Sequence, residues 1–321
     1  MHLVTGGAGF IGSNIVKALV KKYFDVVVVD VIDHKLKTKY LNNLKIKKII
    51  NPIDLFTFIK NNNKKIESII HMGATTSTAE KNLKLLFDNN TNYSLKIFNA
   101  CNKYSIKLIY ASSAATYGDG SQGFSDKNII SNFTNLKPLN YYGISKHLFD
   151  LEIIKEISIN NKINSRPVGL KFFNVYGNNE LHKGSMMSPI AKFYNQIATK
   201  KYLKLFRSHN LNYADGLQSR DFIYVKDCVD IVMWFLHNPN KQGIYNVGTG
   251  KSESFLKLGN IIFKNLNTIK KIKFIDTPKN IRNGYQYKTK ADISSIREIG
   301  YSRKFTNLNK GAEDYIKYYL S

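Results

Sequence analysis

Thr5-Gly6-Gly7-Ala8-Gly9-Phe10-Ile11-Gly12 is the stretch that decides the fold of this 321-residue chain. The apolar run His2–Thr5 before it predicts a strand, and the amphipathic pattern of Gly9–Lys22 predicts a helix. The glycines at positions 6, 9 and 12 permit a tight turn, close approach of the backbone to a pyrophosphate, and helix–strand packing. The helix N-terminus adds unpaired N–H groups that attract phosphate. We therefore expect Gly6, Gly9 and Gly12 to bind a dinucleotide.

An acidic residue ends the next predicted strand. The β-branched run Val26–Asp30 is typical of a strand buried on both faces, and Asp30 lies 18 residues beyond Gly12. A carboxylate there accepts hydrogen bonds from the adenosine ribose and repels a 2′-phosphate, which favours NAD. The residues that follow could neutralise that phosphate, so NADP stays open at this point; they are His34, Lys35, Lys37 and Lys39.

Strands and helices continue to alternate through the first half of the chain. Further strands are predicted at Ser68–His71, Lys107–Ala111 and Val168–Phe172, and further helices at Leu83–Tyr104 and Tyr142–Ile159. This alternation predicts right-handed βαβ units and an α/β fold with a doubly wound parallel sheet.

The regular alternation stops near Asn174. Asn174–Ser188 and His209–Ser219 are polar and contain glycine, which predicts loops, whereas Asp221–Leu236 and Gly243–Val247 resume a strand–helix pattern. The tract Asn61–Lys65 in the first half predicts a solvated turn. We expect a Rossmann domain from residues 1–173 with a returning segment 222–247, and a smaller discontinuous substrate-binding lobe from 174–221 and 248–321.

The composition excludes several classes of protein. Hydrophobic residues make up 43% of the chain, enough for a packed core, which excludes global disorder. No apolar run approaches the ~20 residues of a membrane span, and the first residues do not have the pattern of a signal peptide. The two cysteines, Cys101 and Cys228, cannot build a disulfide scaffold. We therefore expect a cytoplasmic protein with no membrane partner.

The chain is strongly basic, with 48 Lys and Arg against 23 Asp and Glu and a formal net charge of +25. Such a charge can indicate a nucleic-acid partner. However, only six of these cations are arginines, the better fork for phosphate. The lysines are scattered among Asn, Ile, Tyr and Phe, residues with A/T-rich codons. We attribute the excess to genome composition and expect no nucleic-acid partner, although the field would steer an anionic substrate.

Three residues form a candidate catalytic set. Tyr142 and Lys146 are spaced i, i+4, so they share one face of a helix. Tyrosine ionises near pH 10 in isolation, and we expect a nearby ammonium and a nicotinamide ring to lower that pKa. Lys146 can also hold the nicotinamide ribose. Ser113 follows a predicted strand and can donate a hydrogen bond to the reacting oxygen at the carboxyl end of the sheet.

Together these motifs resemble the extended short-chain dehydrogenase/reductase family of nucleotide-sugar enzymes. The matching stretches are TGGAGFIG (5–12), SSAATYG (112–118), YGISK (142–146), NVYG (174–177), RDFIYVKD (220–227) and NVGTG (246–250). Within that family the chain is similar to the enzymes that invert C6 of ADP-glycero-manno-heptose. The stretches that carry this likeness are FIGSNIVKAL (10–19), YASSAATYG (110–118), FNVYG (173–177) with HKGSM (182–186), and WFL (234–236).

The resemblance implies an isomerase that converts the D-glycero to the L-glycero form of ADP-heptose for lipopolysaccharide core biosynthesis. A bound NADP would remove hydride from C6 and return it to the opposite face of the ketone, without net redox change. Such enzymes use two acid/bases, one for each orientation of the sugar. By position these are Tyr142 and Lys183. The resemblance also implies a homo-oligomer, a pentamer.

The same resemblance places cofactor and substrate contacts along the chain. Cofactor contacts fall on Phe10, Ile11, Asp30, Val31, Lys39, Gly73, Ala74, Thr75, Thr76, Asn89, Lys146, Val175 and Lys183. Substrate contacts fall on Asn174, Ser185, Lys192, Phe206, Arg220 and Tyr285. Arg220 suits a bidentate grip on the diphosphate.

The chain departs from the family pattern around the sugar. Lys192 stands where the family has a substrate-binding histidine, and Asn178-Asn179 replace Pro-Arg. Met72 replaces a glutamate, and the segment 209–219 is longer than usual. These departures concern the rim of the sugar pocket and leave the redox residues intact.

Several other functions were weighed. A dehydratase commonly needs an Asp-Glu pair beside the catalytic hydroxyl, but Ala114-Ala115 follow Ser113 here. A UDP-hexose 4-epimerase, or another nucleotide-sugar epimerase, would share every redox residue and differ in the sugar pocket. A non-catalytic nucleotide- or RNA-binding protein would not require Ser113, Tyr142 and Lys146. No metal site is expected, since His71 and His182 lack a Cys/His/acid cluster at metal-ligand spacing.

Overall fold

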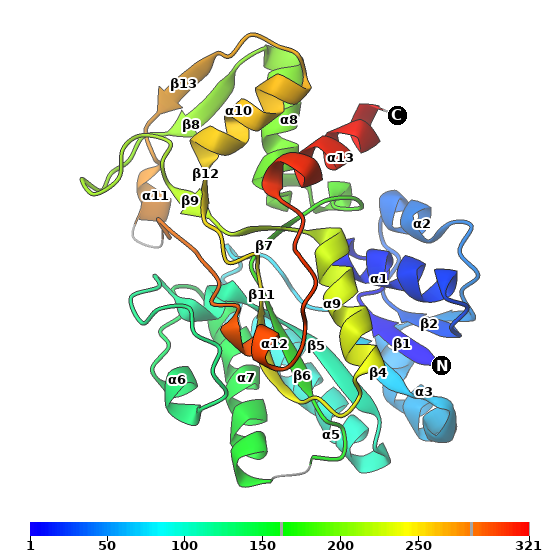
Figure 1. Ribbon diagram of the computed structural model, residues 1–321. Helices are drawn as coiled ribbons and strands as arrows, with labels where there is room; N and C mark the ends of the chain where they lie inside the picture. The colour runs from blue at the N-terminus through cyan, green and yellow to red at the C-terminus, as the bar shows by residue number, and fades with distance from the viewer. Residues whose placement is uncertain (161–162, 283–284, 321) are drawn as a thin grey trace.

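A seven-stranded parallel sheet forms the larger part of the molecule in the computed structural model, which describes residues 1–160, 163–282 and 285–320 (Figure 1). The strand order is β11-β6-β5-β4-β1-β2-β3, so the order reverses between β1 and β4. A reversal of this kind opens a crevice at the carboxyl ends of the strands. The strands are β1 (His2–Thr5), β2 (Val26–Val29), β3 (Lys48–Ile50), β4 (Ser68–His71), β5 (Lys107–Ser113), β6 (Val168–Phe172) and β11 (Gly243–Val247).

Helices cover both faces of this sheet because successive strand residues point to opposite faces. Val26 and Val28 pack against α1 and α9, whereas Val27 and Val29 pack against α3, α5 and α7. Both layers consist mostly of buried aliphatic side chains, with buried aromatic rings such as Phe235 and Phe149 among them. The helices are α1 (Phe10–Lys21), α2 (Lys35–Leu41), α3 (Leu55–Asn62), α4 (Leu83–Leu86), the π-helix η3 (Phe87–Asn92), α5 (Tyr93–Tyr104), α6 (Ile130–Thr134), α7 (Tyr141–Ile159) and α9 (Val225–His237). Short 3₁₀ helices are η1 (Pro52–Asp54), η2 (Asn63–Lys65) and η4 (Ala114–Tyr117).

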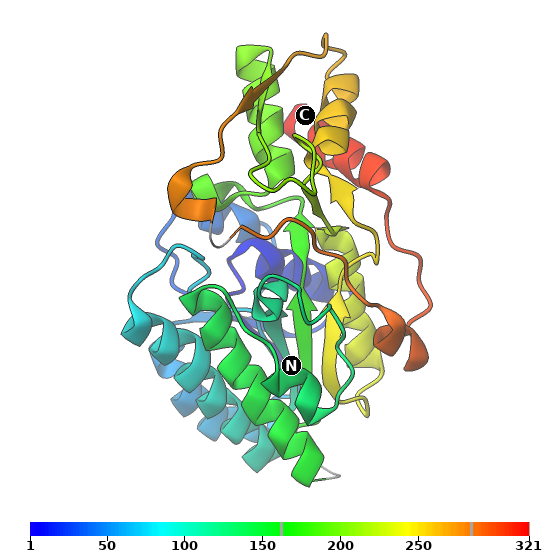
Figure 2. The ribbon, with the colours of Figure 1, turned by 90° about the vertical axis from the view of Figure 1, so that its left-hand side faces the viewer.

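A smaller lobe lies beyond the carboxyl ends of the sheet, at the top of Figures 1 and 2. Three two-stranded sheets and three longer helices build it, with a separate apolar core. Its strands are β7 (Asn174–Tyr176) paired with β10 (Phe222–Tyr224), β8 (Leu203–Phe206) paired with β13 (Ile272–Ile275), and β9 (Ser219–Arg220) paired with β12 (Glu253–Ser254). Its helices are η5 (Leu181–Met186), α8 (Pro189–Lys200), α10 (Phe255–Asn265), α11 (Lys279–Arg282) and α13 (Leu308–Leu320). Helix α12 (Ser294–Glu298) returns to the large sheet beside β11.

The predicted fold class is confirmed, and every predicted strand of the large sheet is present. The region between β2 and β4 was not predicted: α2, β3 and α3 are short and each buries only one or two side chains, so they lack a clear apolar period. The segment Asn174–Ser188 is not simply a loop, because it contains β7 and η5. Asn61–Lys65 ends α3 and then forms η2. Within the described residues, no helix has the length and apolar character needed to cross a membrane.

Candidate active site

The turn between β1 and α1 is a backbone cradle. Gly6 has a φ of 62°, a conformation that only glycine adopts at little cost, and a Cβ there would lie 2.7 Å from the backbone of Gly73. A Cβ at Gly12 would collide with the Gly6 carbonyl oxygen. Gly9 is the N-cap residue of α1 and makes no side-chain cap, so the helix N-terminus faces the turn unblocked. This cradle fits a pyrophosphate held by backbone N–H groups.

The acid after β2 is tied to this turn. Asp30 Oδ2 accepts a hydrogen bond of 2.9 Å from the Ala8 N–H. Lys37 Nζ lies 3.4 Å from the other carboxylate oxygen of Asp30 and 2.9 Å from Asp33, and it also donates to the Val31 carbonyl. The negative charge of Asp30 is therefore partly neutralised by α2, while Lys39, on the same helix, is exposed.

The loop after β4 is fixed in position by hydrogen bonds to the π-helix η3. The Asn90 side chain accepts from the Thr75 N–H at 2.8 Å, donates to the Thr75 carbonyl at 3.0 Å, and donates to Ser145 Oγ at 3.0 Å. Asn89 Nδ2 donates to Thr75 Oγ1 at 3.0 Å. These contacts place the predicted cofactor loop Gly73–Thr76 between the phosphate turn and the helix that carries Tyr142.

Ser113, Tyr142 and Lys146 are brought together at the carboxyl end of β5. Ser113 is the last residue of this strand, and its hydroxyl group forms a hydrogen bond with the Tyr142 side chain. Asn140 caps α7 by accepting from the Gly143 N–H at 2.8 Å, which fixes where the helix starts. Lys146 lies one turn further on, is 3% exposed, and donates to the Ala111 carbonyl at 3.0 Å.

The protein's own groups do not lower the Tyr142 pKa. Burial raises the pKa of this phenol, and the hydrogen bond with Ser113 opposes the rise only in part. The expectation that the Lys146 ammonium lowers it is therefore wrong for the protein alone, because desolvation of the phenolate outweighs the other effects. Burial also lowers the pKa of Lys146 to about 8, against the opposing charge of Asp150.

A buried ion pair lies directly beneath this set. Lys171 Nζ on β6 is 2.8 Å from the Asp150 carboxylate on α7, and both side chains are fully buried. Ser112 Oγ donates to Asp150 at 2.6 Å and Tyr110 OH at 3.0 Å, whereas Lys171 donates to Thr116 Oγ1 at 2.6 Å. The pair therefore connects the strand that ends in Ser113 to the helix of Tyr142 and Lys146.

Lys183 reaches the phosphate turn from the other lobe. Its Nζ lies over the Phe10 ring, 5.5 Å from the centroid, and Phe10 is the first residue of α1. Burial lowers the pKa of Lys183, and the nearby Lys192 cation lowers it further, while the charge of Glu180 opposes both. Ser185 lies in the same short helix and is exposed, and Lys192 is an exposed residue of α8.

A third group of predicted residues lies in the small lobe. The Arg220 guanidinium is 5.5 Å from the ring centroids of both Phe255 and Tyr285, and Phe206 contacts Tyr285 edge to face at 6.5 Å. Burial lowers the pKa of Arg220. Aromatic faces beside a guanidinium suit a nucleotide base and its phosphates.

Strand β7 joins the lobes and carries two predicted contacts. Asn174 Oδ1 accepts from Thr289 Oγ1 at 3.5 Å, and the side chain of Val175 packs against the apolar cores of both lobes, as does Ile11. Asn174 is the more polar of the two and so better suited to a substrate hydroxyl.

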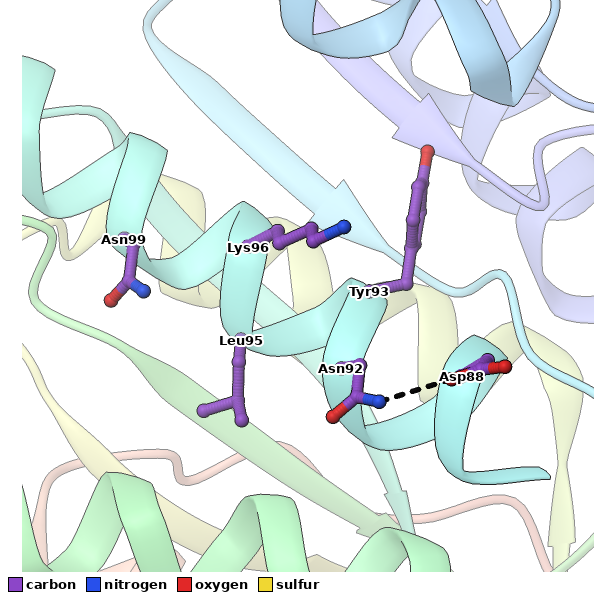
Figure 3. Close-up of a pocket in the computed structure, with 6 residues that line it drawn as sticks. All are labelled: Asp88, Asn92, Tyr93, Leu95, Lys96 and Asn99. Carbon is purple, nitrogen blue, oxygen red and sulfur yellow. Dashed lines mark hydrogen bonds between the residues drawn. The ribbon is translucent and has the colours of Figure 1, made fainter. Parts of the chain in front are cut away.

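Other polar features have structural roles. His71 is buried between Thr5 Oγ1 at 2.6 Å and Ser94 Oγ at 2.9 Å, and burial lowers its pKa to about 3. Among the described residues, no group of His, Cys, Asp and Glu is arranged to hold a metal ion. A pocket of about 390 Å³ lies along η3 and α5, and the residues that line it are drawn in Figure 3. It is lined by Asp88, Asn92, Tyr93, Leu95, Lys96 and Asn99, none of which belongs to the predicted site.

Comparison with known proteins agrees with this geometry. Residues 2–248 match the NAD dependent epimerase/dehydratase family. The chain belongs to this family. A relative from Nitratidesulfovibrio vulgaris, named ADP-L-glycero-D-manno-heptose-6-epimerase, is 41% identical over 324 residues, covering 100% of this chain and 98% of the relative. The resemblance drawn from the motifs is confirmed.

Solved structures of the NAD dependent epimerase/dehydratase family share the architecture. The Helicobacter pylori ADP-L-glycero-D-manno-heptose-6-epimerase aligns with a TM-score of 0.80 and 28% identity, over 100% of this chain and 96% of that one. A UDP-N-acetylglucosamine 4-epimerase from Methanobrevibacter ruminantium, in complex with UDP-N-acetylmuramic acid, aligns with a TM-score of 0.82 and 26% identity, over 99% and 97%. Both lobes are therefore shared with these two enzymes, which are named for different sugars.

The sequence analysis did not predict four residues that support the candidate site. Glu180, Asn90 and the pair Asp150–Lys171 are all fully buried polar side chains. Asn90, Asp150 and Lys171 have partners that are distant in the sequence. The partners of Glu180 are only three and eight residues away, but they lie in an irregular segment, so no helical or strand spacing marks it. One of them could have been found: Lys171 is a charged residue inside the apolar run Val168–Phe172, which indicates a buried partner for its charge.

Proposed function

We propose that this chain inverts C6 of ADP-glycero-manno-heptose, from the D-glycero to the L-glycero form, as a step toward the lipopolysaccharide core. The observation that carries the proposal is that Tyr142 lies beside Ser113 at the carboxyl end of β5, while Lys183 reaches the phosphate turn from the smaller lobe. Inversion at one carbon needs proton transfer for each orientation of the sugar. A site with one acid/base on each side suits that requirement.

The cofactor that fits is NADP. The cradle at Gly6, Gly9 and Gly12 suits a pyrophosphate, and Lys37 offsets the Asp30 charge that would otherwise repel a 2′-phosphate. The exposed Lys39 is available on the same helix. When bound, the nicotinamide supplies a hydride acceptor that can return the hydride to the opposite face of the same carbon.

The chain's own residues move the proton and hold the sugar. With the positively charged nicotinamide beside it to favour the phenolate, Tyr142 would take the proton of the C6 hydroxyl group as the hydride departs, and Ser113 would hold the reacting oxygen by a hydrogen bond. The Lys146 ammonium provides a positively charged hydrogen-bond donor beside Tyr142 and Ser113. Lys183 performs the corresponding proton transfer when the ketone has turned over, and Arg220 grips the diphosphate.

The division of labour follows the two lobes. Residues 1–173 with 222–247 would hold the dinucleotide, and residues 174–221 with 248–321 would hold the sugar nucleotide. In the second part, the proposed substrate contacts besides Arg220 are Asn174, Ser185, Lys192, Phe206 and Tyr285. A homo-oligomer, a cytoplasmic location and the absence of nucleic-acid partners remain predictions of the sequence.

The decisive experiment is incubation with ADP-D-glycero-manno-heptose in D₂O, followed by NMR of the product. We expect L-glycero product with no deuterium at C6, because the hydride stays on the enzyme. Deuterium at C6 would indicate deprotonation at carbon, and no product would refute the substrate.

A UDP-hexose 4-epimerase is the second candidate, supported by the structural likeness to the Methanobrevibacter enzyme. It predicts turnover of UDP-galactose or UDP-N-acetylglucosamine and does not explain the placement of Lys183. Parallel assays with these sugars separate the two candidates. A dehydratase is disfavoured, since Ala114 and Ala115, the residues after Ser113, carry no proton-transfer group.

A further inference from the structure

Glu180 is a fully buried carboxylate that forms no ion pair with any residue that the structure describes. Its Oε1 accepts from the Gly177 N–H at 3.3 Å and from Ser188 Oγ at 2.7 Å, and its Oε2 accepts from the Ser188 N–H at 2.5 Å. Burying a carboxylate without an ion-pair partner costs free energy, and these three hydrogen bonds offset part of that cost.

The partners of Glu180 lie on either side of Lys183. Gly177 follows β7, and Ser188 is the N-cap residue of α8, where its hydroxyl oxygen accepts from the Ala191 N–H at 3.4 Å. The Glu180 carbonyl also accepts from the Lys183 N–H at 3.0 Å. One side chain therefore ties both ends of the segment 177–188, and its main chain begins the turn that carries the lysine.

The charges around Lys183 are of both signs. Glu180 is the carboxylate that raises its pKa, and Lys192 on α8 is the cation that lowers it. His182 and Lys183 follow one another, and α2 packs against this short helix with the Tyr40 hydroxyl accepting from the His182 N–H at 3.2 Å. Two further ionisable groups on that side are His34 and the ion-paired Lys37.

We propose that Glu180 is a positioning residue: its carboxylate holds the segment 177–188 in the shape that places the Lys183 amine at the phosphate turn. Because this carboxylate also carries a negative charge near the amine, its removal should change the pH at which Lys183 titrates. Because Glu180 touches no reacting atom, it acts only through Lys183. The inference rests on the proposed function for the catalytic meaning of Lys183, but its physical content can be measured without substrate.

The test measures the titration of Lys183 directly. The full chain is trace-labelled with acetic anhydride at a series of pH values, and the Lys183 peptide is quantified by mass spectrometry. We expect Glu180→Gln to move the labelling midpoint to lower pH, and Lys192→Met to move it to higher pH, because the removed charges have opposite signs. The matched control is Glu152→Gln, an exposed carboxylate of α7 paired with Lys155, which should not move it.

Turnover is measured on the same proteins. Displacing a catalytic group by about 1 Å can cost on the order of 10²-fold, so we expect Glu180→Gln to lower kcat at least about tenfold in the direction that uses Lys183. Glu180→Asp keeps the charge but is too short to reach both Gly177 and Ser188, so its midpoint should stay near that of the wild type while kcat falls.

Each outcome decides the proposal. A Glu180→Gln midpoint equal to or above that of the wild type would overturn it. If Glu180→Gln does not fold, an unchanged kcat in Glu180→Asp would also overturn the proposal. If the wild type does not act on ADP-heptose, the proposed function fails, whereas the labelling shifts still support or refute the role of Glu180.

Discussion

Lys171 Nζ lies 2.8 Å from the Asp150 carboxylate, and neither side chain is exposed. The lysine belongs to the sheet and the aspartate to the helix of Tyr142. Two aromatic rings, those of Tyr117 and Phe133, lie 4.9 and 5.1 Å from the ammonium. The pair therefore fixes the catalytic helix to the sheet at the depth of the apolar core.

Breaking this pair should destabilise the protein strongly. We expect Lys171→Met or Asp150→Asn to lower the free energy of unfolding by about 3–5 kcal/mol, because each leaves a buried group unpaired. The control, Lys155→Met, breaks the exposed pair with Glu152 and should cost about 0–1 kcal/mol. Urea denaturation measures both. Equal losses in the two cases would mean that the buried pair has no special role.

Tyr142→Phe should leave the fold and cofactor affinity unchanged but lower turnover by about 10²–10⁴-fold, because it removes the hydroxyl group that we propose to transfer the proton. The neighbouring Tyr141 is 43% exposed, so Tyr141→Phe is a matched control with wild-type turnover. Steady-state kinetics and cofactor titration check this. Comparable turnover in wild type and Tyr142→Phe would remove the mechanism.

Lys183→Met should affect the two orientations of the sugar unequally. We expect a loss of about 10²-fold or more in the half-reaction that uses the amine and a small loss in the other. Aldehyde analogues of each configuration at C6 separate the half-reactions. Equal losses in both would indicate that Lys183 only helps to bind the substrate.

Stability should fall in acid because His71 stays neutral in the fold. Its pKa is about 3 in the folded protein against 6.5 in the unfolded chain, so the unfolded state binds more protons between these values. This contribution is present above pH 6.5 and is lost as the pH falls toward 3. Between pH 6.5 and 4.5 the loss is about 2–3 kcal/mol. His71→Asn removes the titrating ring, and its unfolding free energy should fall less steeply over that range; parallel curves would contradict the assignment.

Lys37 should govern the choice of dinucleotide. Lys37→Met removes the cation beside Asp30 and should weaken NADP about tenfold relative to NAD, or about 1.4 kcal/mol. Lys47→Met, which affects only an exposed pair with Asp25, is the control. Calorimetric titration with both dinucleotides measures the ratio. If Lys37→Met weakens the affinities for NADP and NAD equally, Lys37 has only a structural role and does not select the dinucleotide.

The sequence predicted the parts of the site that depend on local spacing. The glycine turn and the Tyr142–Lys146 pair each lie on one element, so their geometry follows from a turn or a helical repeat. It missed Asp150–Lys171 because the partners meet only after the sheet has formed. It did not predict that burial raises the Tyr142 pKa in the protein without its cofactor, since desolvation depends on what covers the ring. It missed α2 and β3 because these elements are short and each buries a single side chain.

The π-helix Phe87–Asn92 has a consequence for protein engineering. A π-turn accommodates one residue more than an α-turn, and such irregularities are common at functional sites. Deleting one residue here would regularise the helix and improve its intrinsic hydrogen bonding, yet it would rotate the following side chains by about 100°. Asn90 would then lose its hydrogen bonds with Thr75 and Ser145. The shortened helix would be more regular, but the loop Gly73–Thr76 would no longer be fixed to it.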